Sequence, residues 1–283
     1  MSGQQVVVIT GCSEGGIGFA LCQEFASKGC KVYATARKLE AMAALTHPNI
    51  ERLRMDVTDG TSVKAGIEQI VEKEGRIDML VNNAGVTCTG PVIDLDDARI
   101  QQTFDTNVFG TIRTSRAVIP HMAARKSGTI VNIGSFVGEL TMPFAGVYSA
   151  SKAALHAITD ALYMECLPFN ISVVLVSSGG ARSDILKRES QNAAPILTTL
   201  YTDYVDVIRA KMDPKLTAAA TPLDEYARDL VRKVLRKDPP RYFSIGFGSM
   251  LIWVVRQFPR GWIYRLLWSQ TVEKERVKLA KAK

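Results

Sequence analysis

The stretch VVVITGCSEGGIGFAL, residues 6–21, decides the fold of this chain. Its first five residues are all β-branched, which predicts a buried strand. Glycines then allow a tight turn, and the residues that follow, to about Lys28, predict a helix. Glycines at a strand-to-helix turn let a pyrophosphate group approach the backbone and rest on the helix N-terminus. The stretch therefore predicts an α/β protein with a phosphate-binding turn near its N-terminus.

The same order of strand and helix repeats along the chain. It predicts a single doubly wound, Rossmann-type α/β domain with right-handed crossovers and a central parallel sheet of about seven strands. We expect this domain over residues 1–245, with a substrate loop at 179–215 where the pattern weakens, and a separate C-terminal segment over 246–283. The later strands are expected in KVYAT, RLRMDV, MLVNNAG, TIVNIGS, ISVVLVS and RYFSI, with helices at 41–45, 62–74, 97–125 (two helices), 148–165 and 223–237.

Composition fits one large folded domain, because 283 residues with 47% hydrophobic content can bury a substantial core. No signal peptide is expected, since the first strand starts at Val6 with no charged leader before it. The three histidines show no metal-ligand spacing, so no metal is expected. The cysteines show no paired spacing and are expected to be buried, reduced thiols, as in a cytosol-facing protein; they are Cys12, Cys22, Cys30, Cys88 and Cys166.

The net charge of +7 comes entirely from the C-terminal end. Residues 1–240 hold 26 basic and 26 acidic residues, whereas residues 241–283 hold nine basic and two acidic ones. The three tryptophans, Trp253, Trp262 and Trp268, also lie in this last stretch. A nucleic-acid-binding protein would carry its basic patch on the folded domain, so no nucleic acid is expected as a partner.

Tyr148 and Lys152, in the run VYSASKAAL, are the most informative pair of residues. In a helix, a spacing of four puts both side chains on one face, about one turn apart. An ammonium near a phenol lowers the tyrosine pKa from its usual value of about 10, so that the tyrosine can exchange a proton near neutral pH. The pair alone is weak evidence for a catalytic site, because many solvated helices contain it. Ser135 adds weight, since it ends a buried strand, where ligands of parallel α/β sheets bind.

Together with the glycine turn, these residues resemble the short-chain dehydrogenase/reductase family over roughly residues 4–245. The resemblance implies an NADP(H)-dependent oxidoreductase that acts on CH–OH groups. The motifs occur in the family's order and spacing: Thr10–Gly11, Gly15–Gly18, Asp56–Val57, Asn82–Gly85, Asn107, Ser135, Tyr148 and Lys152.

The resemblance implies four catalytic residues. Ser135 and Tyr148 would hold the substrate carbonyl oxygen, and Tyr148 would donate the proton. Lys152 would lower the tyrosine pKa and bind the nicotinamide ribose, and Asn107 would anchor a water that connects Lys152 to solvent. Donors aimed at the oxygen on which negative charge develops would lower the barrier. His156, one turn after Lys152, is interpreted as a helix-face residue.

A cofactor site is also implied by the resemblance. The turn TGCSEGGIG has one residue more than the family's usual TG-x3-G-x-G, which leaves open which glycine makes the closest approach. Arg37 and Lys38 favour NADPH over NADH, because a cation accommodates the 2′-phosphate, although Glu14 could repel it. Ser178 stands where the family has proline. The implied cofactor residues are Gly11, Ser13, Gly16, Ile17, Gly18, Arg37, Asp56, Val57, Asn83, Ala84, Gly85, Tyr148, Lys152 and Ser183.

Within the family, the chain resembles fungal 1-acyldihydroxyacetone-phosphate reductases in TGCSEGGIG, ATARKLEAMAAL, SGGARSDI and MLIWVV. This implies NADPH-dependent reduction of 1-acyldihydroxyacetone phosphate to 1-acylglycerol 3-phosphate (lysophosphatidate). Arg182, Lys187 and Arg188 would then hold the substrate phosphate, or else are solvated surface charges. The alternatives are a 17β-hydroxysteroid or retinol dehydrogenase, a ketoreductase of specialised metabolism, and a lipid-droplet protein that retains only the fold.

The C-terminal tail is interpreted as a membrane-interface segment. The uncharged run at residues 243–255 is shorter than the roughly 20 residues that span a bilayer. From about Gly248 to Trp268, aromatic residues alternate with arginines, as in segments that lie among lipid headgroups. We therefore expect a peripheral, cytosol-facing protein on lipid droplets or the endoplasmic reticulum. A cap over the pocket, which is compatible with membrane contact, and a contact in a homo-oligomer are the alternatives.

Overall fold

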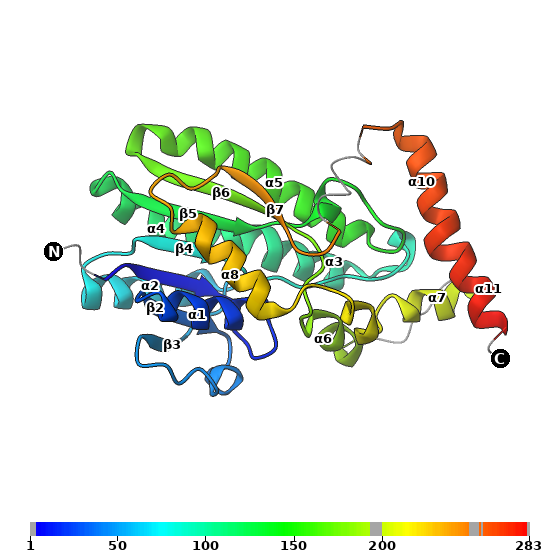
Figure 1. Cartoon of the computed structure of the whole chain (residues 1–283), viewed down its shortest axis with the longest axis horizontal. Helices are drawn as coiled ribbons and strands as arrows, with labels where there is room; N and C mark the ends of the chain where they lie inside the picture. Colours follow the sequence, from blue (N-terminus) through cyan, green and yellow to red (C-terminus); the bar gives the residue numbers. More distant parts are fainter. Residues whose placement is uncertain (1–3, 193–199, 249–254, 256, 282–283) are drawn as a thin grey trace.

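A parallel sheet forms the centre of the molecule (Figure 1). The computed structural model describes residues 4–192, 200–248, 255 and 257–281. Seven strands lie in the order β3-β2-β1-β4-β5-β6-β7, and every neighbouring pair is parallel, which confirms the predicted fold. The strands are β1 (Val6–Thr10), β2 (Lys31–Ala36), β3 (Ile50–Arg54), β4 (Met79–Asn82), β5 (Gly128–Ile133), β6 (Ile171–Ser178) and β7 (Tyr242–Ile245).

Helices cover both faces of the sheet. On one face, α1 (Ile17–Ser27) and α8 (Leu223–Val234) pack against each other and over inward side chains that include Val7 and Ile9. On the other face, α2 (Gly60–Glu74), α4 (Gly110–Ala124) and α5 (Gly146–Cys166) contribute to a core that includes Val6 and Val8. Because successive strand residues point to opposite faces, a strand buried on both sides is apolar at every position, as VVVIT is.

The strand order reverses between β1 and β4, which are hydrogen-bonded neighbours. At such a switch point, the loops that leave the carboxyl ends of the strands turn to opposite sides, and ligands of open α/β sheets bind there. The glycine turn follows β1, the NNAG motif follows β4, and Ser135 follows β5. The topology thus brings motifs from three distant parts of the sequence to one edge of the sheet.

Two segments differ from the sequence prediction. The helix expected at residues 41–45 is wrong, since Leu39–Met42 form a 3₁₀ turn instead. Pro48 disfavours a helix that continues to β3, and short helices are marginal in water. The two helices expected between residues 97 and 125 form one continuous run of α3 (Asp97–Phe104), a π-helical turn (Asp105–Phe109) and α4.

The described part of the weakly patterned region after β6 contains two short α-helices, α6 (Ile185–Asn192) and α7 (Val205–Ala210). The tail continues through α10 (Arg260–Trp268), a π-helical turn (Ser269–Glu273) and α11 (Lys274–Lys281). Figure 1 shows α10 and α11 as one long helical run that reaches α7, on the side of the molecule away from the N-terminus. Within the described residues, no helix is both long enough and apolar enough to cross a bilayer. All five cysteines are buried free thiols.

An aromatic cluster joins the tail to the body of the protein. Trp268 lies 5.9 Å from the ring centre of Phe144 and 5.6 Å from that of Tyr204. Phe144 also lies 5.8 Å from Tyr201. Val272 of the tail is fully buried in the same cluster. Because Phe144 lies between Ser135 and Tyr148 in the sequence, the tail contacts the segment that connects these two predicted catalytic residues.

Candidate active site

The glycine turn packs closely against the loop after β4. Gly11 has a φ of +72°, and a Cβ atom there would lie 2.7 Å from the backbone of that loop. A Cβ atom on Gly18 would lie 2.5 Å from Asn83 Nδ2 and 2.7 Å from the Gly11 carbonyl oxygen. Gly15, with a φ of +72°, extends the turn, and Gly16 is the N-cap of α1. The turn with its extra residue is therefore closed by Gly11 and Gly18.

Thr10 holds the NNAG motif against β1. The backbone N–H groups of Asn83 and Ala84 donate to Thr10 Oγ1, each at 3.0 Å. The Asn83 side chain donates to the carbonyl oxygens of Thr10 (2.8 Å) and Gly11 (3.1 Å). Asn82 is buried and donates to Asn132 Oδ1 at 2.9 Å. These hydrogen bonds thus join the end of β1 to the loop after β4, and β4 to β5.

Asn107 lies in the π-helical turn, and its side chain is buried. Oδ1 accepts the Val86 N–H at 2.8 Å, while Nδ2 donates to the Val86 carbonyl (2.9 Å) and to Ser151 Oγ (3.0 Å). A Cβ atom on Gly85 would lie 3.3 Å from Asn107 Oδ1 and 3.7 Å from Lys152 Nζ. The π-helical turn, a feature often found at functional sites, therefore places Asn107 beside Lys152 with only Gly85 between them.

Ser135 and Tyr148 meet at the carboxyl end of β5. Ser135 is buried, whereas Tyr148, in the first turn of α5, is half-buried. Burial raises the pKa of Tyr148 to about 12, the hydrogen bond with the Ser135 side chain lowers it, and the charge of Glu189 raises it. The phenol is therefore protonated at neutral pH and is available as a proton donor.

Lys152 lies one turn after Tyr148 on α5 and is 5% exposed. Burial lowers its pKa to about 8. Nζ donates to the Ile133 carbonyl at 2.9 Å and lies 5.9 Å from the centre of the Tyr148 ring. Burial is the largest effect on both groups and leaves the pKa of Tyr148 above its usual value, so the expected lowering by Lys152 stays a prediction.

Two further residues lie at this site: His156, which the sequence analysis interpreted only as a helix-face residue, and Glu189, which it did not single out. His156 Nε2 accepts the Ser135 N–H at 3.3 Å, and a Cβ atom on Gly134 would lie 2.4 Å from this nitrogen, so a glycine is needed there. The spacing of four after Lys152 is the signal that could have indicated His156. Glu189, whose charge acts on Tyr148, comes from the weakly patterned loop after β6, and no spacing indicates it.

The other predicted cofactor residues lie farther along the same edge. Arg37 follows β2 and is exposed, and Arg54 Nε donates to its carbonyl at 3.3 Å. Asp56 and Val57 follow β3; Asp56 Oδ1 accepts from the backbone N–H (3.0 Å) and the hydroxyl (2.8 Å) of Thr58. The ends of β2 and β3 thus carry two arginines and a carboxylate that orders its own loop.

The loop after β6 holds the last predicted cofactor residue, Ser183, whose N–H donates to the Ala181 carbonyl at 2.8 Å. At the family's proline position, Ser178 accepts a hydrogen bond from the Tyr226 hydroxyl of α8 at 2.9 Å. The serine therefore ties α8 to the end of β6, a contact that proline could not make.

Comparisons with known proteins agree with this arrangement. Residues 5–194 match the family model described as short chain dehydrogenase. A relative from Schizosaccharomyces pombe, named NADPH-dependent 1-acyldihydroxyacetone phosphate reductase, is 39% identical over 219 residues, covering 76% of this chain and 73% of the relative. A relative of the same name from Saccharomyces cerevisiae is 34% identical over 262 residues, covering 89% of this chain and 86% of the relative.

Among solved structures, a short-chain dehydrogenase from Streptomyces avermitilis is similar with a TM-score of 0.76 and 27% identity, covering 90% of this chain and 92% of that one. The family model, the two fungal relatives and this fold point to one conclusion. The chain belongs to the short-chain dehydrogenase family and is an oxidoreductase.

Proposed function

We propose that this protein uses NADPH to reduce a carbonyl group of a lipid-like substrate, most specifically 1-acyldihydroxyacetone phosphate, to the alcohol 1-acylglycerol 3-phosphate. One observation carries the proposal: the Tyr148 phenol, protonated at neutral pH, lies beside the Ser135 hydroxyl and within 5.9 Å of Lys152 Nζ, measured to the ring centre. The names of the two fungal relatives support the cofactor and the substrate.

The residues along the sheet edge fit a dinucleotide. Helix α1 begins at Gly16 without a side-chain cap, so its first backbone N–H groups can donate to a diphosphate. A side chain at Gly16 would meet the Ser13 carbonyl at 3.0 Å, which keeps the turn bare. Arg37 is exposed after β2, and residues 34–38 contain no acid that could bind a ribose 2′-hydroxyl. These features favour the 2′-phosphate of NADPH over NADH, and the exposed Glu14 can turn to solvent.

When bound, NADPH supplies the hydride. Tyr148 donates its phenolic proton to the carbonyl oxygen, and Ser135 donates a hydrogen bond to the same oxygen. The ammonium of Lys152 then stabilises the phenolate, and binding of the nicotinamide ribose is its second role. Asn107 holds the Val86 backbone beside Lys152, and a water relay from this corner would return the proton.

The three cationic residues of the substrate loop, Arg182, Lys187 and Arg188, differ in how well they are placed to bind a substrate phosphate. Arg188 donates to the carbonyl oxygens of Ser13 and Glu14, which commits it to the glycine turn. Arg182 and Lys187 are exposed, although Lys187 lies 3.9 Å from Asp184. We therefore expect Arg182 and Lys187 to hold a substrate phosphate, and replacing both with alanine to raise the KM of a phosphorylated ketone without affecting a neutral one.

A substrate panel tests the proposal. NADPH consumption is measured with 1-acyldihydroxyacetone phosphate, a 17-ketosteroid and retinal, using the full chain. We expect kcat/KM for the acylated phosphate to exceed the others by at least about tenfold, as a site with matched polar contacts discriminates. A preference for the steroid or retinal would favour the alternative substrates, for which the aromatic cluster around Phe144 provides an apolar surface. No NADPH consumption with any ketone would refute the reductase itself.

We also propose that the tail holds the protein on a lipid surface, of lipid droplets or the endoplasmic reticulum. On α10, Trp262 is 59% exposed and Leu266 46% exposed, and the exposed Arg260 and Arg265 lie among them. Such a mixture suits an interface with anionic headgroups. Trp268 differs from the expectation, because it packs inward and donates to Glu273 at 3.0 Å, and Trp253 lies outside the described residues. The inward-facing residues of the tail also support the alternative that the tail caps the pocket.

Surface substitutions test the lipid proposal better than a truncation, which would also remove the buried Ile263 and Val272. The double variant Trp262→Ser/Leu266→Ser should float less with anionic vesicles, and added salt should weaken flotation of the wild type. Leu216→Ser is the matched control, since Leu216 is 58% exposed but lies outside the tail. Equal flotation of the double variant and the wild type would end the membrane proposal.

A further inference from the structure

Glu189, on α6, has a buried carboxylate that bonds to a loop about a hundred residues earlier in the chain. Its side chain is 6% exposed. Oε2 accepts hydrogen bonds from the hydroxyls of Thr87 (2.8 Å) and Thr89 (3.0 Å), and Oε1 accepts the Thr89 N–H at 2.6 Å. Arg99 adds a cation 3.8 Å from Oε1. Every contact connects α6 to the loop that directly follows NNAG, or to the helix after that loop.

The neighbouring residues of α6 hold the opposite side of the edge. Arg188 donates to the carbonyl oxygens of Ser13, at 3.4 Å, and Glu14. The Asp184 N–H, one residue before α6, donates to the Gly15 carbonyl at 2.9 Å. Helix α6 therefore bridges the glycine turn and the loop after NNAG, the two loops at the switch point of the sheet.

We propose that Glu189 is a positioning residue, which latches α6 over this edge and thereby limits the rate at which the dinucleotide leaves. The inference rests on the proposed binding of NADPH. Because α6 is hydrogen-bonded to both loops, a ligand that rests on them should leave more easily when α6 lifts. When α6 lifts, the contacts of Glu189 should break at once. A partial release would leave the carboxylate buried without its partners, which is strongly unfavourable.

The same carboxylate has a second consequence for Tyr148. After burial, which is the largest effect, the negative charge of Glu189 also raises the pKa of Tyr148. A latched α6 therefore helps to keep the phenol protonated, so closure of the loop and readiness of the proton donor are coupled through one residue.

The dissociation rate of NADPH, followed by stopped-flow fluorescence, tests the latch. Glu189→Ala should increase this rate about tenfold or more, since one hydrogen bond to a charged group is worth about that factor. The KM for NADPH should rise in parallel, by a larger factor than any change in kcat. Glu189→Gln should remain close to the wild type, because its amide oxygen can accept the Thr89 N–H while its NH₂ donates to a threonine hydroxyl.

Gln191→Ala is the matched control, on the same helix and exposed. A wild-type dissociation rate in Glu189→Ala would overturn the latch, as would an equal increase in Gln191→Ala. If Glu189→Ala does not fold, Thr87→Val deletes one bond at constant side-chain shape and should still raise the rate about threefold; an unchanged rate in that variant would overturn the latch too. A wild-type protein that binds no NADPH would instead refute the proposed function, and the latch with it.

Discussion

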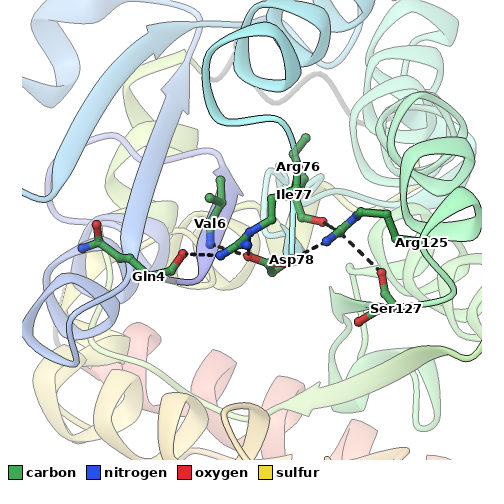
Figure 2. A network of polar contacts seen from close by, with 7 residues as sticks. All are labelled: Gln4, Val6, Arg76, Ile77, Asp78, Arg125 and Ser127. Carbon is green, nitrogen blue, oxygen red and sulfur yellow. Dashed lines mark hydrogen bonds and ion pairs between the residues drawn. The ribbon is translucent and has the colours of Figure 1, made fainter. Parts of the chain in front are cut away.

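The two ends of the parallel sheet differ in how they surround a charged group. At the amino end, the carboxylate of Asp78 receives the Val6 N–H (2.8 Å), Arg76 Nε (3.0 Å) and Arg125 NH1 (3.2 Å), as Figure 2 shows. At the carboxyl end, the ammonium of Lys152 is 5% exposed and donates to a carbonyl oxygen, and burial lowers its pKa to about 8. One end neutralises its charge with ion pairs, and the other keeps a charge that solvent cannot stabilise.

The network at the amino end has a structural purpose. Arg76 also reaches the Gln4 carbonyl (2.9 Å), and Arg125 reaches the carbonyls of Ile77 (2.7 Å) and Ser127 (3.4 Å) (Figure 2). These bonds tie the starts of β1, β4 and β5 together. The comparison teaches that satisfied charges stabilise the fold, whereas perturbed groups gather where chemistry is expected. Three substitutions and one change of pH test this contrast.

The largest effect should follow from Tyr148→Phe at the carboxyl end. Because only the proton donor is lost, kcat should fall by about 10²–10⁴, the usual contribution of a general acid. The dissociation constant for NADPH and the free energy of unfolding should remain nearly unchanged. Steady-state kinetics, fluorescence titration and urea unfolding on the same preparation measure all three. A variant that keeps more than about a tenth of the wild-type rate would remove Tyr148 as the acid.

Arg37→Ala should have the next largest effect. Losing a charged hydrogen bond to the 2′-phosphate should raise the dissociation constant for NADPH by about ten- to a hundredfold and leave that for NADH unchanged. Titration with both dinucleotides measures this difference. Arg228→Ala, an exposed arginine of α8 that pairs with Asp224, is the control. Equal weakening of both cofactors would contradict a 2′-phosphate role for Arg37.

Asp78→Asn should weaken the fold and spare the site. The variant keeps the size of the side chain but loses the charge that two arginines share, so the free energy of unfolding should fall by about 1–3 kcal/mol. Binding of NADPH and kcat should not change. Asp224→Asn provides the comparison, since its ion pair is exposed and should contribute less than about 1 kcal/mol. A loss of NADPH affinity in Asp78→Asn would show that the two ends are not independent.

The smallest effect concerns pH and Lys152. With a pKa of about 8, Lys152 loses its proton as the pH rises, while Tyr148, at about 12, keeps its own. The rate of carbonyl reduction should therefore fall up to about tenfold per pH unit above pH 8, because the phenolate loses its stabilising cation. Between pH 8 and the ordinary value of 10.5, the unfolded lysine binds more protons, so this group's contribution to stability should rise with pH.

A pH–rate profile of kcat/KM beside unfolding curves measures both trends. Reduction that stays constant to pH 10 would contradict the lowered pKa of Lys152. Parallel losses of rate and stability would show instead that unfolding, rather than deprotonation at the site, limits the rate.

The strands and the catalytic motifs could be predicted because their signals are local. β-branched runs indicate β1, β5 and β6 directly, and Tyr148 and Lys152 share a helix face through a spacing of four alone. The π-helical turn at Asp105–Phe109 could not be predicted. It inserts one residue between two helices, and the apolar periodicity indicates only the helices on either side. The 3₁₀ turn at Leu39–Met42 depends on the length of the link into β3, which propensity does not register.

The sequence by itself determined the α/β class, the glycine turn, the order of the strands along the chain and the family motifs, since each rests on neighbours within one element. Tertiary structure decided which charges and rings are buried. Trp262 and Trp268 lie six residues apart, yet one faces solvent and the other packs on Phe144. Glu189 meets Thr87 and Thr89 across about a hundred residues, and burial raises the pKa of Tyr148 to about 12. Whether a charged or aromatic side chain is buried depends on contacts between distant segments of the packed chain, and a local pattern does not specify those contacts.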